Sequence, residues 1–184
     1  MQTYIALLRG INVSGQKIIK MENLRSLFSE LGFQNVQTYI QSGNVVFNSK
    51  TKSIRALEKT IHDGIKRRFK YEVEVFVIDS DEIESVCRLN PFKTKQKSEF
   101  SKIYVTICSE EISKQMCEQL LKYKAETEVI FAIKNKVYMY CSNGIGKSKL
   151  SNNLIEKTFE LRATTRNINT MLAIETMIRK IKSV

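Results

Sequence analysis

Three segments of this 184-residue chain combine glycine with polar side chains that could bind a ligand. They are residues 7–15, residues 40–47 and residues 144–150, and each interrupts apolar, strand-like sequence. Glycine and asparagine let the backbone turn sharply, so each segment places polar groups where a strand ends. Loops of this kind often carry binding residues, although they also serve as plain turns.

The third segment partly matches a phosphate-binding loop. Residues 141–148 read Cys-Ser-Asn-Gly-Ile-Gly-Lys-Ser, but a P-loop requires glycine where Cys141 stands, so a nucleotide hydrolase is not indicated. A simpler anion site remains, because Lys147 and Ser148 would lie in the first turn of a helix, where N–H groups are free. The alternative is a tight loop in which Ser148 or Ser151 caps that helix.

The first segment places an arginine at the end of the first expected strand. Arg9 offers a planar fork that suits phosphate or carboxylate, and Asn12 follows it in a loop framed by glycines. A surface arginine, or one paired with a carboxylate, is the alternative. Both this loop and residues 142–148 are expected at carboxyl ends of strands, so they could share a cleft if the two halves pack with those edges together.

Two further polar residues are expected at the start of the last helix. Asn167 is a natural helix cap, which would be a structural role. Arg166 has no capping role, and it would add positive charge beside a helix N-terminus. Arg166 is therefore a candidate anion-binding residue, and we include Asn167 with it.

The charge of the chain favours negatively charged partners. The formal net charge is +11, and residues 134–184 contribute +7 of it, with ten Lys or Arg against three Glu. Such a surface attracts nucleic acid or phosphorylated ligands, although lysine-rich surfaces also simply keep proteins soluble. No apolar run is long enough to cross a membrane and no signal peptide is evident, so we expect a cytoplasmic protein.

Several kinds of catalytic centre are not indicated. The single histidine, His62, lies in a predicted helix, and we expect it at the solvent edge of that helix. The four cysteines are scattered without a Cys-x-x-Cys pair, so they suggest neither a zinc site nor a redox centre. We therefore expect no metal and no cofactor.

The pattern of apolar residues repeats. In each half a strand, a helix, a hairpin of two strands and another helix follow in order, with a last strand that is shorter in the second half. This order predicts an α+β fold of two tandem ferredoxin-like βαββα(β) units, whose antiparallel sheets pack into one compact body. We expect the first unit at residues 1–78, a helical connection and linker at residues 79–98, and the second unit with a closing helix at residues 99–184.

A resemblance to a known family is carried by residues 7–15, 38–47, 90–92, 147–150 and 165–170. With these segments the chain resembles a bacterial family known as domain of unknown function 1697. It implies a compact α/β protein without an assigned activity. It also adds Ser42 and Asn44 to the candidate site, although we expect their turn at the sheet edge opposite the loop after the first strand. Glycine at position 43 is explained by a left-handed turn.

Two functional hypotheses follow, with a third left open. The first is a module that binds a phosphate-bearing small molecule or nucleic acid. The second is a small enzyme without metal or histidine catalysis, in which Lys147 or Ser42 is catalytic. A structural or adaptor protein is the third, and a homodimer stays open. The candidate binding residues are Arg9, Asn12, Lys147, Ser148, Arg166 and Asn167, with Ser42 and Asn44 as additional candidates.

Overall fold

The chain forms two compact units in a computed structural model that describes residues 1–182. The first unit comprises residues 1–84 together with the C-terminal segment from Ala173, and the second comprises residues 85–172. The helix α6 (Ile168–Lys182) therefore begins in the second unit and ends in the first. The domain boundaries expected at residues 78 and 98 stay a prediction.

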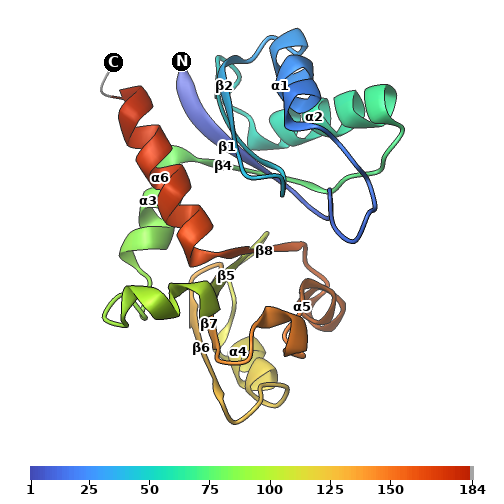
Figure 1. Cartoon of the computed structure of the whole chain (residues 1–184). Coiled ribbons are helices and arrows are strands. Elements are labelled where there is room, and N and C mark those ends of the chain that lie inside the picture. The colour runs from blue at the N-terminus through green and yellow to red at the C-terminus, as the bar shows by residue number, and fades with distance from the viewer. Residues whose placement is uncertain (183–184) are drawn as a thin grey trace. The chain divides into compact units, whose positions relative to one another are not determined.

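The first unit is an antiparallel sheet with two helices on one face (Figure 1). Its strands stand in the order β2-β3-β1-β4, so the first strand lies in the middle of the sheet. The elements are β1 (Gln2–Leu8), α1 (Met21–Glu30), β2 (Gln34–Tyr39), β3 (Asn44–Ser49), α2 (Ile54–Phe69) and β4 (Val75–Asp79), and α3 (Ser80–Arg88) begins directly after β4.

Aromatic side chains form the centre of the core between this sheet and its helices. The ring of Phe47 on β3 lies 4.6 Å from that of Phe33, 5.4 Å from that of Phe28 and 5.9 Å from that of Tyr4, measured between centroids. Phe28 comes from α1, whose apolar residues recur at helical spacing and face the sheet. The core of the first unit therefore joins both central strands to α1.

The second unit repeats the same topology. Its strand order is β6-β7-β5-β8, which matches β2-β3-β1-β4 position by position. Its elements are the 3₁₀ helix η1 (Lys97–Lys102), β5 (Ile103–Cys108), α4 (Lys114–Leu121), β6 (Glu128–Ile133), β7 (Lys136–Cys141), the 3₁₀ helix η2 (Ile145–Lys147), α5 (Asn152–Phe159) and β8 (Ala163–Asn167). The predicted fold class, two tandem α+β units with antiparallel sheets, is confirmed.

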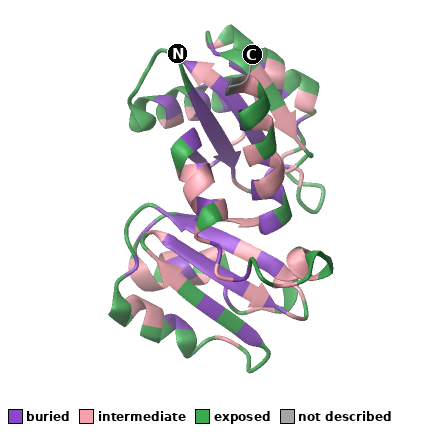
Figure 2. Cartoon of the chain, turned by 90° about the vertical axis from the view of Figure 1, so that its left-hand side faces the viewer, coloured by how far each residue is buried: buried purple, intermediate pink, exposed green. Residues whose placement is uncertain are grey.

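Both faces of the second sheet are covered. Residues of α4 and α5 pack with Val137 and Met139 on one face. On the other face, the hydroxyl of Tyr138 donates to the carbonyl oxygen of Val86 over 2.9 Å, and Phe92 lies against Phe131 with ring centroids 5.5 Å apart. The end of α3 and the segment that follows it thus cover this face, and most residues of the central strands are buried (Figure 2).

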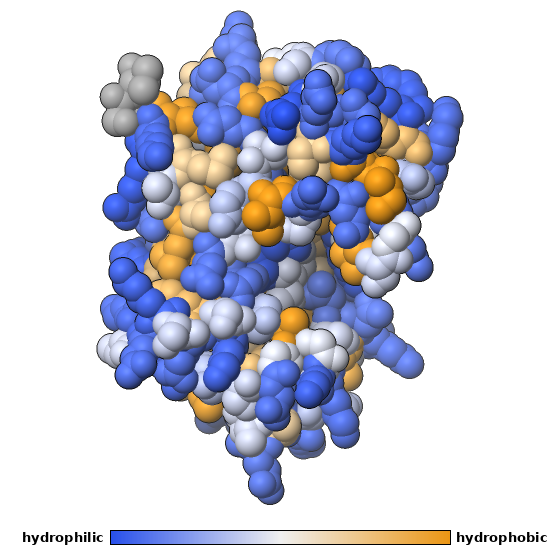
Figure 3. Space-filling view, in the orientation of Figure 1, coloured by the Kyte–Doolittle hydropathy of each residue, from blue (hydrophilic) through white to orange (hydrophobic). Residues whose placement is uncertain are grey.

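Hydrophilic residues cover most of the face that Figure 3 shows, and apolar residues reach it only in small groups. None of the helices in residues 1–182 is both long enough and apolar enough to span a membrane.

Candidate functional site

The loop that follows β1 is held by the side chain of Asn12. Its amide nitrogen donates to the carbonyl oxygens of Ile19, over 2.9 Å, and of Gln41, over 2.8 Å. Its amide oxygen accepts from the backbone N–H of Ile19 over 2.8 Å. Asn12 has φ +54°, a conformation that asparagine tolerates better than most residues. The polar atoms of Asn12 therefore fix the loop, and its expected role in binding a ligand stays a prediction.

Replacing Asn12 by Asp tests this structural role. The carboxylate cannot donate, so it would lose both bonds to carbonyl oxygens and repel them. We expect Asn12→Asp to lower the free energy of unfolding by about 1–3 kcal/mol, measured by urea denaturation. Asn23→Asp is the matched control, because Asn23 is exposed and the change adds the same charge. Equal stability of the two variants would contradict the role.

The turn at Ser42 and Asn44 lies at the same end of the sheet as the loop after β1. Asn44 pairs with Leu7, and the backbone N–H of Leu8 donates to the carbonyl oxygen of Gly43 over 2.8 Å. The expectation that this turn lies at the opposite edge is wrong, because β3 runs antiparallel to β1 and starts where β1 ends. The amide of Asn44 donates to the hydroxyl of Ser42 over 3.0 Å and to the carbonyl oxygen of Tyr39 over 3.2 Å. Both side chains therefore contribute to the turn itself.

A cavity of about 400 Å³ opens beside Arg9 in the first unit. Its walls come from three parts of the chain: the end of β1 with the loop that follows, the middle of α2, and the segment that leads into β4. The lining residues are Arg9, Gly10, Lys17, His62, Glu72, Val73 and Glu74.

The segment that leads into β4 is held by hydrogen bonds from the end of β1, from the loop after β1 and from α2. The backbone N–H of Arg9 donates to the backbone carbonyl oxygen of Glu74 over 2.9 Å. The ammonium of Lys17 donates to the backbone carbonyl oxygen of Glu72 over 2.5 Å. The ring of His62 places Nδ1 2.9 Å from the carbonyl oxygen of Val73 and Nε2 3.1 Å from the carboxylate of Glu72. These bonds therefore hold residues 72–74, which form one wall of the cavity, in place.

The helix that forms one wall of this cavity, with the residues just before it, carries an excess of positive charge. Residues 50–70, which include all of α2, carry eight Lys or Arg against two acidic residues, a net charge of +6. Glu72 also lies beside Lys66, and the hydrogen bond from that ammonium lowers the pKa of the Glu72 carboxyl. Glu72 thus stays ionised at neutral pH, and its charge is balanced by a neighbouring cation.

The sequence reasoning missed Lys17, His62 and Glu72 as residues of the site. His62 was expected at the solvent edge of α2, and its side chain is indeed 35% exposed, but its place in the wall of a cavity was not predicted. A usable signal was its place next to Ile61, because this puts it at the border of the apolar stripe that packs on the sheet. Lys17 gave no comparable signal, since its position depends on how the loop folds back.

Lys147 and Ser148 do not lie in the first turn of the α-helix that follows them. Lys147 ends the short 3₁₀ helix η2, and α5 begins only at Asn152, with Ser151 as its cap. The backbone N–H groups of Lys147 and Ser148 donate to the carbonyl oxygens of Gly144 and Ile145, over 3.2 and 3.1 Å. The expected position of these residues at the start of the α-helix is therefore wrong, because the loop with these hydrogen bonds separates them from α5. That Lys147 and Ser148 bind an anion stays a prediction.

Arg166 and Asn167 end β8 rather than starting the last helix. The side-chain oxygen of Asn167 accepts from the backbone N–H of Asn169 over 2.9 Å, so the predicted capping role of Asn167 at α6 is confirmed. Arg166 donates to the hydroxyl of Thr164 over 3.1 Å and to the carbonyl oxygen of Thr165 over 2.9 Å. Burial of the guanidinium lowers the pKa of Arg166 to about 10.

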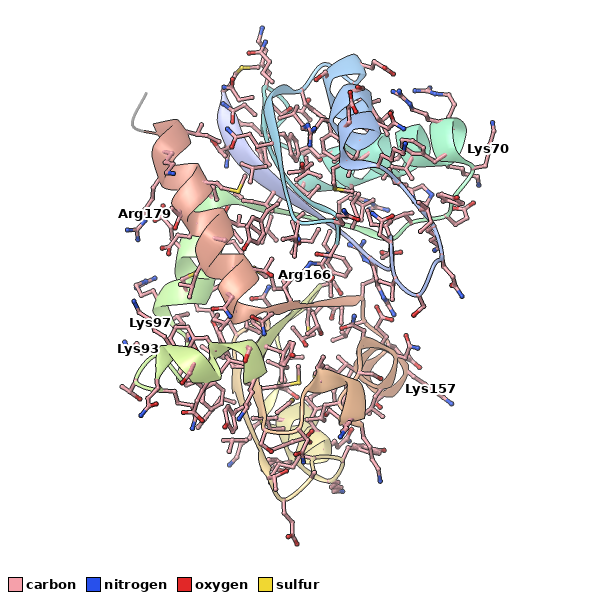
Figure 4. The ribbon with its side chains drawn as sticks, in the orientation of Figure 1. Lys70, Lys93, Lys97, Lys157, Arg166 and Arg179 are labelled. Atoms are coloured by element: carbon pink, nitrogen blue, oxygen red, sulfur yellow. The ribbon has the colours of Figure 1, made fainter. Side chains whose placement is uncertain are left out.

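The candidate residues of the second unit lie where β7 and β8 end, at the same end of the sheet, but on different faces of it. Tyr104 pairs with Asn167 and Ile103 with Tyr140, so β7 and β8 both end beside the start of β5. The hydroxyl of Thr165 contacts Asn152 of α5 over 2.6 Å, and since neighbouring residues of a strand alternate, Arg166 lies on the sheet face away from α5. Cations of this unit are also spread around it: Lys93 and Lys97 project from the segment after α3, and Lys157 from α5 on the other side (Figure 4).

Arg9 and Asn12 belong to the first unit, and Lys147, Ser148, Arg166 and Asn167 to the second. That they serve one common ligand stays a prediction.

None of the four cysteines, all of which lie in the described part of the chain, forms a disulfide. Burial raises the pKa of the Cys108 thiol to about 12 and that of Cys141 to about 11, which suppresses the nucleophilic thiolate. Within the described part of the chain, no group of three His, Cys, Asp or Glu residues could hold a metal ion.

The sequence pattern of one family, described as a protein of unknown function (DUF1697), matches residues 1–138. The chain belongs to this DUF1697 family. The matched part contains the complete cavity around Arg9 and the turn at residues 42–44, and it ends within β7. It does not include the loop with Lys147 or the strand with Arg166.

One solved structure has the same fold. It is a conserved bacterial protein from Streptococcus pneumoniae, which is 22% identical, with a TM-score of 0.74, and the match covers 97% of this chain and 99% of that one. At this identity the likeness concerns the fold alone. No curated protein matches the chain.

Proposed function

We propose that the protein binds a phosphate-bearing small molecule in the cavity between β1, α2 and the segment leading into β4. The observation that carries this proposal is the meeting of Arg9, Lys17 and His62 around a space of about 400 Å³. Pockets for small ligands have volumes of roughly 300–1,000 Å³. The space therefore suits a nucleotide or a sugar phosphate better than a bare ion.

The charge of the cavity supports an anionic ligand despite its two carboxylates. Glu72 is balanced by Lys66, and the whole region adjoins α2 with its excess of cations. Lys17 already donates to a backbone carbonyl, which carries no charge, so its positive charge remains available to a ligand. Arg9 is the second cation of the lining, and its planar guanidinium is of the kind that binds phosphate in bidentate fashion.

The geometry supports binding better than catalysis. In a histidine that acts as a general base, one ring nitrogen is oriented by the protein and the other faces the substrate. Here the carbonyl oxygen of Val73 lies at Nδ1 and the carboxylate of Glu72 at Nε2. His62 is thus engaged on both sides, and it forms part of the wall of the cavity.

The proposal is tested by removing the two cations of the cavity. Adenosine triphosphate and inorganic phosphate are titrated by calorimetry, and a labelled single-stranded oligonucleotide by fluorescence anisotropy. We expect Arg9→Ala/Lys17→Ala to weaken binding of adenosine triphosphate at least about tenfold, because each lost charge-assisted bond contributes about 1.5–3 kcal/mol. Higher salt should weaken binding further.

The matched control is Lys50→Ala/Lys52→Ala, which removes the same charge from exposed positions of the same unit. An equal loss in both double variants would mean that overall charge, rather than the cavity, attracts the ligand. Absence of binding to the wild-type protein at low salt would refute the proposal. Binding of the oligonucleotide alone would favour nucleic acid over a small molecule.

A further inference from the structure

The one histidine of the chain, His62, lies in the wall of the cavity with a hydrogen-bond acceptor at each of its ring nitrogens. Nδ1 lies 2.9 Å from the backbone carbonyl oxygen of Val73, and Nε2 lies 3.1 Å from a carboxylate oxygen of Glu72. A carbonyl oxygen and an ionised carboxylate accept hydrogen bonds and cannot donate them. Both ring nitrogens must therefore carry hydrogen if both contacts are hydrogen bonds.

Only the positively charged form of the ring meets this condition. A neutral imidazole has one N–H group and one nitrogen with a lone pair, whichever tautomer it adopts. One of the two contacts would then place this lone pair against an oxygen atom, which repels it. Glu72 does not relieve the conflict by taking up the proton itself, because the hydrogen bond from Lys66 lowers the pKa of its carboxyl. The geometry thus fits an imidazolium held between Val73 and Glu72.

The charged groups around His62 are of both signs. They are Asp63 and Lys66 on α2, Arg9 at the end of β1 and Lys17 in the loop that follows, and Glu72 and Glu74 in the segment before β4. One turn earlier on α2, Lys59 pairs with Asp63 over 2.6 Å, and Glu58 accepts from the backbone N–H of Val77 over 3.1 Å. Since cations and anions oppose each other here, an additional anion in the cavity shifts the balance toward the charged ring.

We propose that His62 takes up a proton from solvent when the cavity binds its anionic ligand, so that binding weakens as the pH rises through neutrality. This inference rests on the proposed function of the cavity. A nearby negative charge favours the charged form of a histidine, and histidine is the residue type of the lining whose charge changes between pH 5 and 8. Because both N–H groups are engaged by the protein, His62 acts on the ligand through its charge.

The direction of the pH dependence follows from the reciprocity of linked binding. If the ligand favours the proton on His62, the proton favours the ligand by the same factor. Binding that takes up one proton strengthens by at most about tenfold for each unit by which the pH falls. Between about pH 8 and about pH 6 we expect the affinity to rise about tenfold in total, the order of magnitude for a pair of charges near a protein surface.

Calorimetric titration with adenosine triphosphate at these two pH values measures the affinity, and buffers of different ionisation enthalpy give the number of protons taken up. His62→Gln should bind at both pH values as weakly as the wild type does at the higher one. The terminal phosphate of the nucleotide also gains a proton in this range, and His62→Gln measures this contribution alone. His62→Lys keeps a positive charge, so it should bind at the higher pH about as tightly as the wild type does at the lower one.

Nitrogen-15 NMR of the wild-type protein tests the proton directly and needs no variant. Because the chain has a single histidine, its ring signals require no assignment, and they distinguish a neutral from a doubly protonated imidazole. At neutral pH, saturating adenosine triphosphate should shift both ring nitrogens of His62 toward the doubly protonated form.

Two results would overturn this inference and leave the proposed function standing. The first is a ring with the same protonation state in the free protein and in the saturated complex. The second is equal proton uptake by the wild type and His62→Gln. Absence of nucleotide binding to the wild type at both pH values would instead refute the proposed function and this inference with it.

Discussion

Replacing Phe47 by alanine should destabilise the first unit by about 3–5 kcal/mol, the usual cost of removing a large buried aromatic side chain. Phe47 is fully buried on β3, and its ring contacts those of Tyr4, Phe28 and Phe33. Its removal would leave a cavity that rigid neighbours on β1 and α1 cannot fill. The melting temperature should fall by roughly 10 °C, measured by calorimetry.

The control is Phe131→Ala, which removes the same side chain from an exposed position on a strand of the second unit. This change should lower stability by only about 1–1.5 kcal/mol, because nearly half of the Phe131 side chain is already exposed. A similar loss in both variants would show that the aromatic cluster around Phe47 is not the centre of the core.

Replacing Gly43 by alanine should cost about 2–5 kcal/mol, through two separate effects. Gly43 has φ +75°, and a left-handed conformation costs a residue with a Cβ atom about 1–2 kcal/mol. That Cβ atom would also lie 2.7 Å from Cβ of Leu8 and 2.8 Å from Cδ1 of Ile11, and such overpacking costs about 1–3 kcal/mol. Both neighbours are buried, so neither can move aside easily.

Gly15 separates the two effects. Its φ is +74°, nearly the same as that of Gly43, but nothing lies within 4 Å of the position of its Cβ atom. Gly15→Ala should therefore lose only about 1 kcal/mol, from the backbone conformation alone. Urea denaturation of both variants gives the difference, which measures the close approach of the turn to β1. Equal losses would mean that the turn can move away from Leu8.

The type and order of the helices and strands could be predicted from the sequence because they depend on near neighbours. Leu57, Ile61 and Ile65 recur at helical spacing and indeed form the buried stripe of α2. Position 43 was also predicted correctly as a left-handed glycine. The positions of helix starts were less well predicted: Ser148 and Ser151 both suit a helix cap, and only the three-dimensional structure shows that Ser151 has this role.

The candidate site could be predicted only in part, because it is formed by contacts between distant parts of the chain. Arg9 was recognised from its place at the end of a strand, but its partners around the cavity come from α2 and from the segment before β4. Asn12 and Asn44 have the polar side chains of binding residues, and in the structure these side chains hold loops.

The sequence by itself thus determined the repeated α+β units, the apolar faces of their helices and the excess of positive charge. Tertiary structure decided which loops lie at the same end of a sheet and which side chains face a cavity. The physical reason is that the period of apolar residues is local, whereas strand pairing depends on direction and register. Because β3 runs antiparallel to β1, the turn at residues 42–44 lies beside the loop that carries Arg9. Because the segment before β4 folds against α2, His62 lies next to Glu72.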